Sequence, residues 1–297
     1  MNTLIETLQY FAIITFELIV LFIFITAIVE FILMHISEEK MRKKLGGKGV
    51  IGNIVAAAIG SLTPFCACST IPMTIGFLNA KVPFGAVASF LIASPLLNPI
   101  IIGMLGALVG FKIAAIYFII AFTLSVLFGY ILEKTGASKL VKNVRVKGRG
   151  TINQYKKSIP FKQKVKISFK AGFDTLRPIM LYLLIGVALG AGIYGYMPEN
   201  FVLKIAGPDN LFAVPIASIV GIPLYIRAET AIPIGLALMN KGMSIGAVIS
   251  LIIGGAGMAI PEISLLSSIF KPKLVFAFVV VIFFTAVISG YVFNIIF

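Results

Sequence analysis

Long runs of apolar residues, separated by short polar segments, make up most of the chain. Each run exceeds the roughly 20 residues that a helix needs to cross about 30 Å of hydrocarbon. The pattern predicts six full membrane spans, at residues 8–34, 83–109, 112–132, 173–197, 244–269 and 273–297. The first run has no basic segment before it and is too long for a signal-peptide core, so we expect it in the mature protein.

Two further apolar stretches are short and broken. One comprises residues 50–64 and 70–80, and the other comprises residues 211–225 and 230–240. At 1.5 Å per residue, arms of about 11 to 15 residues reach only about 16 to 22 Å. Each pair of arms is therefore either one broken span or a re-entrant hairpin.

Composition excludes a water-soluble globule, and the charge is concentrated in one place. Of the 297 residues, 59% are hydrophobic and 12% are charged, and the net charge is +14. Residues 134–170 alone contain twelve Lys and Arg and no acid. A basic segment between apolar runs is typical of a cytoplasmic loop, which also attracts membrane lipids. It lacks the aromatic platform of a nucleic-acid-binding surface, so we expect no nucleic-acid partner.

The charge pattern constrains the first broken stretch. A smaller basic cluster at residues 40–48 should also be cytoplasmic, and an even number of crossings must separate it from residues 134–170. The runs 83–109 and 112–132 already supply two crossings. Residues 50–80 therefore leave and return on the cytoplasmic side, as a hairpin does, although two compressed crossings would also satisfy the count. Continuing the count predicts that both termini are external.

The chain repeats itself at an offset of 161 residues. Ten identities fall within 33 positions, and the shared Gly, Pro and Asn residues are not what apolar bias alone would produce. The pairs are Gly60 and Gly221, Ala67 and Ala228, Ile71 and Ile232, Pro72 and Pro233, Asn79 and Asn240, Gly85 and Gly246, Ala86 and Ala247, Val87 and Val248, Ser89 and Ser250, and Ile92 and Ile253.

Three crossings in each half would make this duplication inverted, an arrangement typical of secondary transporters. The sequence thus predicts an all-α polytopic membrane protein with two inverted-topology repeats, each containing a broken re-entrant helical hairpin. The first repeat occupies residues 1–133, the basic cytoplasmic linker residues 134–170, and the second repeat residues 171–297.

The break in the first hairpin carries the two cysteines of the chain. Proline disrupts a membrane helix, which is tolerated where the freed carbonyls face protein or a watery cavity. Cys66 and Cys68 would share a face only on extended backbone, and thiolates select soft partners such as Cu(I), Zn or trivalent arsenic. Alternatively, they are small residues packed in a tight break. The predicted substrate-binding residues here are Pro64, Cys66, Cys68, Ser69, Thr70 and Pro72.

The break in the second hairpin carries a charged pair. Arg227 aligns with Cys66, and Glu229 aligns with Cys68. Charges inside an apolar hairpin are costly unless they pair or face a cavity, so they indicate either a functional site or a structural ion pair. The predicted substrate-binding residues are Arg227, Glu229, Thr230 and Pro233, with Glu229 also a coupling carboxylate.

The spans after the two hairpins are also interrupted, at residues 94–99 and 254–262. Asn98 is predicted to bind substrate and Glu262 to take part in coupling, although Glu262 would instead lie at the cytoplasmic end if it is close to Lys271. The chain carries no nucleotide-binding loop or hydrolase motif, so we expect neither an enzyme nor a bound cofactor or resident metal.

The strings TPFCACSTIP, GFLNAKVPFGAVASFLIASPLLNP and GIPLYIRAETAIPIGLALMNKG resemble the predicted-permease family of the UPF0718 type, which includes bacterial efflux permeases for trivalent organoarsenicals. The resemblance implies a multi-pass permease of the inner (plasma) membrane. It places Cys66 and Cys68 at positions that the arsenical exporters link to thiol-seeking substrates. Most members of the family have no established substrate.

These observations predict a secondary active transporter, which we expect to be an exporter driven by protons or ions. Its substrate would be a small molecule or ion, such as an organoarsenical or a soft metal(loid), moved by alternating access between the repeats. The arrangement also allows a homodimer. The alternatives are an intramembrane thiol-dependent redox enzyme that uses Cys66 and Cys68, and an integral subunit of a larger permease complex.

Overall fold

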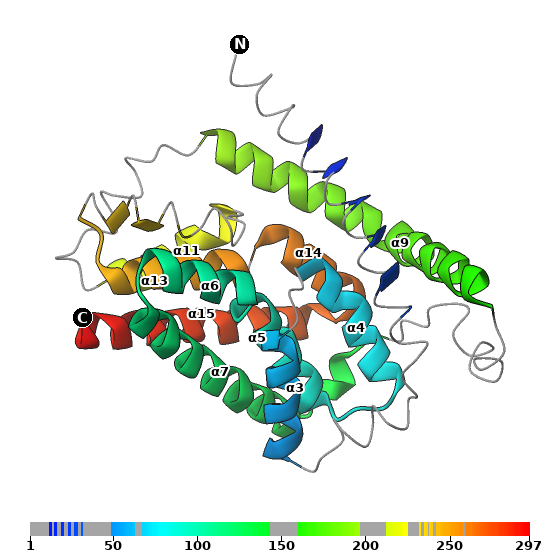
Figure 1. Ribbon diagram of the computed structural model, residues 1–297, viewed down its shortest axis with the longest axis horizontal. Coiled ribbons are helices and arrows are strands. Elements are labelled where there is room, and N and C mark those ends of the chain that lie inside the picture. The colour runs from blue at the N-terminus through cyan, green and yellow to red at the C-terminus, as the bar shows by residue number, and fades with distance from the viewer. Residues whose placement is uncertain are drawn as a thin grey trace.

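The computed structural model describes residues 49–62, 67–142, 160–196, 212–224, 242–257 and 259–297, with isolated positions at 12–31 and 232–239. Helices are the regular elements of these parts, which confirms the predicted helical class (Figure 1). They are α3 (Val50–Leu62), α4 (Ala67–Asn79), α5 (Phe84–Leu96), α6 (Pro99–Leu108), α7 (Phe111–Lys134), η1 (Ala137–Leu140), α9 (Phe161–Tyr196), α11 (Ala213–Leu224), α13 (Ile245–Gly257), α14 (Ile260–Ile269) and α15 (Pro272–Ile296).

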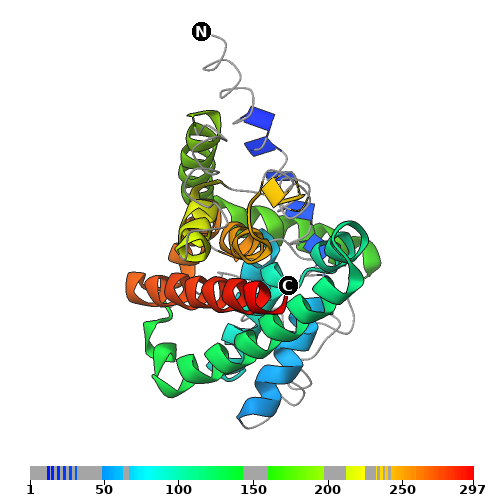
Figure 2. The same cartoon turned by 90° about the vertical axis from the view of Figure 1, so that its left-hand side faces the viewer.

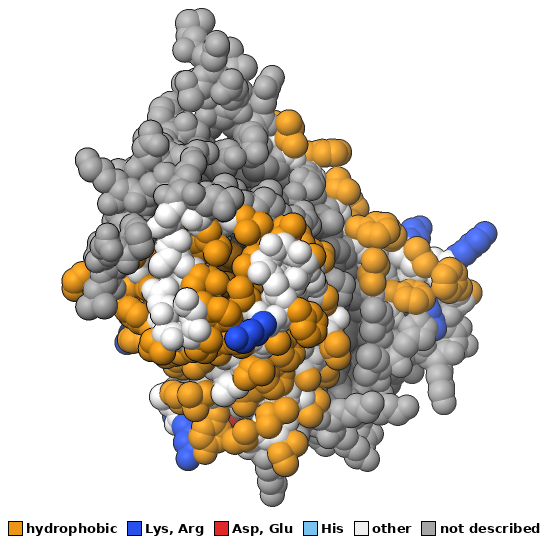
Figure 3. All heavy atoms as spheres, turned by 60° about the vertical axis from the view of Figure 1, so that its left-hand side comes forward, with side chains coloured by type: hydrophobic (Ala, Val, Ile, Leu, Met, Phe, Trp, Pro, Cys, Tyr) orange, Lys and Arg blue, Asp and Glu red, His pale blue; other side chains and the backbone are white. Residues whose placement is uncertain are grey.

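Three helical stretches in the described parts are long and apolar enough to cross a membrane: Phe84–Leu108, α7 and α15. Together, α13 and α14 make a fourth stretch, bent by 44° at its break. These four stretches correspond to predicted spans. The predicted span at 173–197 falls mostly within α9, and most of the predicted span at 8–34 lies outside the described residues. Hydrophobic side chains cover much of the described surface in Figure 3, as expected for a protein that faces lipid.

The basic segment contains more helix than its charge pattern predicts. η1 begins at Ala137, and α9 begins at Phe161, inside the segment that the charge pattern marked as a linker. The middle of that segment, residues 143–159, lies outside the described residues.

The helix boundaries repeat at the offset found in the sequence. Helices α13 and α14 begin and end 161 residues after α5 and α6, and α15 begins 161 residues after α7. Proline lies at the start of both α6 and α14, where its missing N–H needs no partner. The same local signals therefore position the same elements in both halves.

The close packing of α3 on α5 is repeated by α11 on α13. A Cβ at Gly60 would lie 3.1 Å from the carbonyl oxygen of Phe90, and a Cβ at Gly221 would lie 2.6 Å from that of Leu251. Both glycines thus let two backbones approach directly, and the four residues are paired by the 161-residue offset.

The contact of α7 with α5 is repeated in the same way by α15 with α13. A Cβ at Gly129 would lie 2.7 Å from the Gly85 carbonyl oxygen, and a Cβ at Gly290 would lie 2.7 Å from the Gly246 carbonyl oxygen. The duplication therefore extends from sequence to tertiary packing.

Helix directions follow from pairs of contacts. The Ser250 hydroxyl donates to the Val214 carbonyl oxygen at 2.9 Å, and Gly221 lies near Gly255. Since both contacts advance in the same direction along the two helices, α11 and α13 run parallel. In the first half, a short turn joins α4 to α5, and Phe77 packs on Phe90 with ring centroids 5.0 Å apart, so α4 runs antiparallel to α5.

Helices α7 and α15, which are equivalent under the offset, run in opposite directions. Just beyond α7, Leu140 accepts a hydrogen bond from Lys271 N at the start of α15, at 2.9 Å. At the other end, Lys112 Nζ lies 5.2 Å from the centroid of the Phe297 ring. Figure 1 and Figure 2 show α7 in green and α15 in red, inclined to each other.

Candidate functional site

Two helix breaks meet where the two halves of the molecule touch. Helix α5 ends at Leu96 before α6, and α13 ends at Gly257 before α14. A Cβ at Gly257 would lie 3.1 Å from Leu96 Cδ2. Leu96 and Gly257 are equivalent under the 161-residue offset, so the ends of the two interrupted helices face each other.

Side chains complete the backbone hydrogen bonding of the first break. Tyr117 on α7 is buried, and its hydroxyl donates to the carbonyl oxygen of Leu96 at 2.9 Å. Asn98 caps α6, because its Oδ1 accepts from Ile100 N at 3.0 Å. One atom of Asn98 therefore has a structural partner, and its role in binding substrate stays a prediction.

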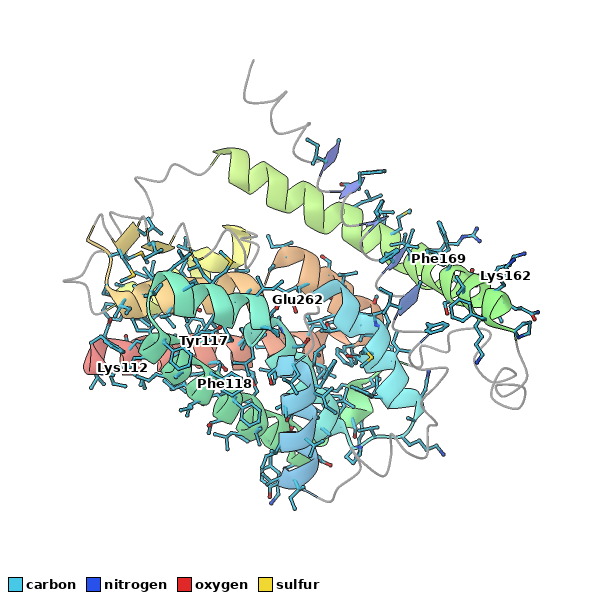
Figure 4. The ribbon with its side chains drawn as sticks, viewed as in Figure 1. Lys112, Tyr117, Phe118, Lys162, Phe169 and Glu262 are labelled. Carbon is cyan, nitrogen blue, oxygen red and sulfur yellow. The ribbon has the colours of Figure 1, made fainter. Side chains whose placement is uncertain are left out.

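The second break is built differently. Ala259 occupies the N-cap of α14 without a side-chain hydrogen bond, and Phe278 stands at the position equivalent to Tyr117. Glu262 lies in the first turn of α14, beside the break, and only 5% of its surface is exposed (Figure 4). Whether Glu262 couples transport or lies at the cytoplasmic end of its span stays open.

Helix α4 contains part of the cysteine motif. It begins at Ala67, so Cys68 and Ser69 fall in its first turn, although the structure does not describe their side chains. Ala67 and Cys68, which would have to be extended for both thiols to share a face, are helical. Thr70 is buried, and Pro72 lies inside α4.

Six other predicted site residues lie outside the described part of the chain: Pro64, Cys66, Arg227, Glu229, Thr230 and Pro233. Their roles stay predictions. Within the described residues, no three His, Cys, Asp or Glu side chains come together as a metal site.

A set of buried polar side chains in the first half was not predicted from the sequence. They lie on α3, α4 and α5, and their polar atoms have no hydrogen-bond partner among the described residues: Asn53, Thr74, Ser89 and Ser94. In the second half, Ser250 is equivalent to Ser89 and donates to the Val214 carbonyl. Asn53 within the apolar arm at 50–64 was the available signal, since asparagine is rarely buried without a partner.

Apolar helices of membrane-spanning length, a duplicated packing pattern and two breaks that face each other define the chain as a polytopic helical membrane protein. The chain belongs to the ArsP_1 family, described as "Predicted permease", which matches residues 2–295. The resemblance seen in the motifs is therefore confirmed across nearly the whole chain.

Known relatives are distant but cover most of the chain. The "UPF0718 protein MJ0584" of Methanocaldococcus jannaschii is 26% identical, over 83% of this chain and 82% of the relative. A Streptococcus mutans protein, named as a candidate subunit of a two-component membrane permease complex, is 24% identical over 87% and 85%. The "UPF0718 protein YcgR" of Bacillus subtilis is 23% identical over 82% and 81%. No solved structure matches the chain.

Proposed function

We propose that the protein is a secondary active transporter that exports a small solute by alternating access between two inverted repeats. The main observation in support of this function is that the equivalent helix breaks after Leu96 and Gly257 face each other where the two halves are in contact. Interrupted helices at a repeat interface are where transporters of this architecture bind their substrates. Membership of a permease family supports a transporter over the thiol-dependent redox enzyme considered from the sequence.

The proposed topology is inverted, with the basic end of the molecule in the cytoplasm. In its support, α7 and α15 are equivalent and antiparallel, as an inversion requires. The same end of the molecule carries Lys142, whose Nζ donates to the Ser267 carbonyl at 2.6 Å, and the exposed Lys271. A concentration of Lys near span ends is typical of the cytoplasmic side. Both termini would then be external, at the plasma (inner) membrane.

The proposed substrate is a thiol-seeking species, such as a trivalent organoarsenical or a soft metal(loid). Cys66 and Cys68 would bind it, because thiolates are soft ligands. Arg227 and Glu229 would face it from the second hairpin. Glu262 would couple transport to protons, since a buried carboxylate beside a helix break can exchange a proton as access alternates. A homodimer stays a prediction.

The test is transport by the purified chain in liposomes, with phenylarsine oxide as the probe. We expect uptake into liposomes whose transporters face inside out, and the double variant Cys66→Ser/Cys68→Ser should lose it. Ser138→Ala, in η1 at the basic end, is the control and should transport normally. Equal uptake by the double variant would exclude the cysteine site. A broad solute panel that gives no transport would count against the transporter itself.

The second candidate is an integral subunit of a larger permease complex, suggested by the name of the Streptococcus mutans relative. The liposome experiment also separates this candidate, because a subunit that needs a partner should fold yet fail to transport alone. Transport by the isolated chain would show that no partner is required.

A further inference from the structure

Helix α9 is longer than a membrane crossing requires. Its 36 residues extend about 54 Å, whereas the hydrocarbon core is about 30 Å thick. The apolar run begins near residue 173, so the first three turns project beyond it. Figure 4 shows Lys162 and Phe169 on this projecting part of the helix.

One face of this part combines cations with aromatic rings. At about 100° per residue, six exposed side chains fall within about 100° around the helix. We call them the basic–aromatic stripe: Lys162, Lys166, Phe169, Lys170, Phe173 and Arg177. On a neighbouring face of the helix, Ser168, Gly172 and Leu176 are buried. The stripe therefore borders the buried face of α9 and is itself exposed along its length.

The charge of the stripe is not balanced by its own helix. Helix α9 contains five Lys and Arg and one acid, Asp174. Residues 134–160, which precede it in the chain, add basic residues and no acid. An anion is thus the complementary partner.

The aromatic side chains identify what kind of anion fits. Phe173 is 60% exposed and Phe169 is 39% exposed. Phe169 also packs on Phe24 of the N-terminal segment, with ring centroids 6.2 Å apart, and Phe161 packs on Phe31 at 5.6 Å. Aromatic side chains of α9 and of the N-terminal segment thus form an apolar surface beside the cations. A soluble anion would leave this apolar surface exposed to water, whereas an acyl chain would bury it.

We propose that the basic–aromatic stripe of α9 is a binding site for an anionic glycerophospholipid. The phosphate lies among Lys162, Lys166 and Lys170, and the acyl chains lie along Phe169 and Phe173. Aromatic residues and snorkelling cations such as Arg177 are the usual residues of a membrane interface. The site binds α9 to one leaflet beside the contact with the N-terminal segment.

The test measures lipid binding to the full chain in mild detergent by native mass spectrometry. We expect phosphatidylglycerol to bind in preference to phosphatidylcholine. Each Lys near an anionic headgroup should contribute about fivefold in affinity, so the triple variant Lys162→Gln/Lys166→Gln/Lys170→Gln should bind phosphatidylglycerol roughly 100-fold more weakly. Lys164→Gln is the matched control, because this half-buried side chain lies off the stripe in the same turns, and it should bind normally.

Two further arms separate a lipid from a soluble phosphate. Glycerol 1-phosphate should bind weakly to the wild-type protein and to every variant. The double variant Phe169→Ala/Phe173→Ala should bind phosphatidylglycerol more weakly, with no change in its binding of glycerol 1-phosphate. Unchanged phosphatidylglycerol binding in the triple variant, an equal loss in Lys164→Gln, or full-strength binding of glycerol 1-phosphate would each overturn the proposal. If the triple variant fails size-exclusion chromatography, Lys166→Gln and Lys170→Gln are measured singly, each with an expected loss of about fivefold.

Discussion

At the scale of single residues, one hydroxyl group completes the first helix break. Tyr117 Oη donates to the Leu96 carbonyl in a buried setting, and a buried carbonyl without a donor costs about 1–3 kcal/mol. Tyr117→Phe should therefore destabilise the protein by that amount, measured as a lowered unfolding temperature in detergent. Tyr130→Phe, on the less buried part of the same helix, should change it far less. Equal effects of the two variants would contradict this role.

Glu262 allows a prediction about coupling at the same scale. Glu262→Gln keeps the shape of this buried side chain and removes its ability to titrate. If the carboxyl carries the coupled proton, the variant should lose uptake driven by a pH gradient and retain exchange of substrate across liposomes. Glu133→Gln, at the end of α7, should retain both activities. Gradient-driven uptake by Glu262→Gln would exclude the coupling role.

The two breaks show how far sequence reasoning reaches at this scale. Asn98 and Glu262 could be selected from the sequence, since polar residues in apolar spans are few. Tyr117 could not, because its partner lies 21 residues away and is set by the packing of α7 on α5. The capping use of Asn98 likewise depends on where α6 begins.

At the scale of elements, the helix crossings depend on glycine. Gly129 and Gly290 have no room for a Cβ at the crossings with α5 and α13. Gly129→Ala and Gly290→Ala should each destabilise the protein by about 1–3 kcal/mol, because added atoms in a tight interface force the backbones apart. Thermal unfolding in detergent measures both variants.

The control for this prediction is Gly103→Ala on α6. A Cβ there would meet nothing within 4 Å, so its effect is limited to helix propensity, which favours Ala by up to about 1 kcal/mol. A result in which all three variants behave alike would show that the crossings tolerate the extra atoms.

Prolines and glycines made most element boundaries predictable from the sequence. The interruptions expected at 94–99 and 254–262 appear as the breaks after α5 and α13. The start of α9 was not anticipated, because dense Lys residues suggest a loop although Lys is a good helix former. Its helical stripe becomes visible only when exposure is known.

At the scale of the whole molecule, the positions of the basic residues predict which helix ends lie on the same side of the membrane. Lys139 and Lys273 lie at the end where η1 meets α15, and Lys112 lies at the opposite end. In a Cys66→Ser/Cys68→Ser background, Lys139→Cys and Lys273→Cys should react with an impermeant maleimide from the same side. Lys112→Cys should react only from the other side. Labelling of all three from one side would contradict the proposed topology.

The offset and the charge pattern were visible in the sequence because both are long-range regularities. The contact between Leu96 and Gly257 could not be predicted from the sequence, because no local sequence pattern indicates which residues of the two halves are in contact.

The antiparallel pairing of α7 and α15 also bears on how a duplicated protein of this kind can exist as one chain. A half-length chain could rebuild that contact only with an oppositely inserted copy of itself, as an isologous dimer. Identical copies carry the same charge bias and therefore favour one insertion direction. In the proposed inverted topology, a fused chain avoids this conflict, because the basic residues that follow the first half would fix the insertion of both halves in opposite directions.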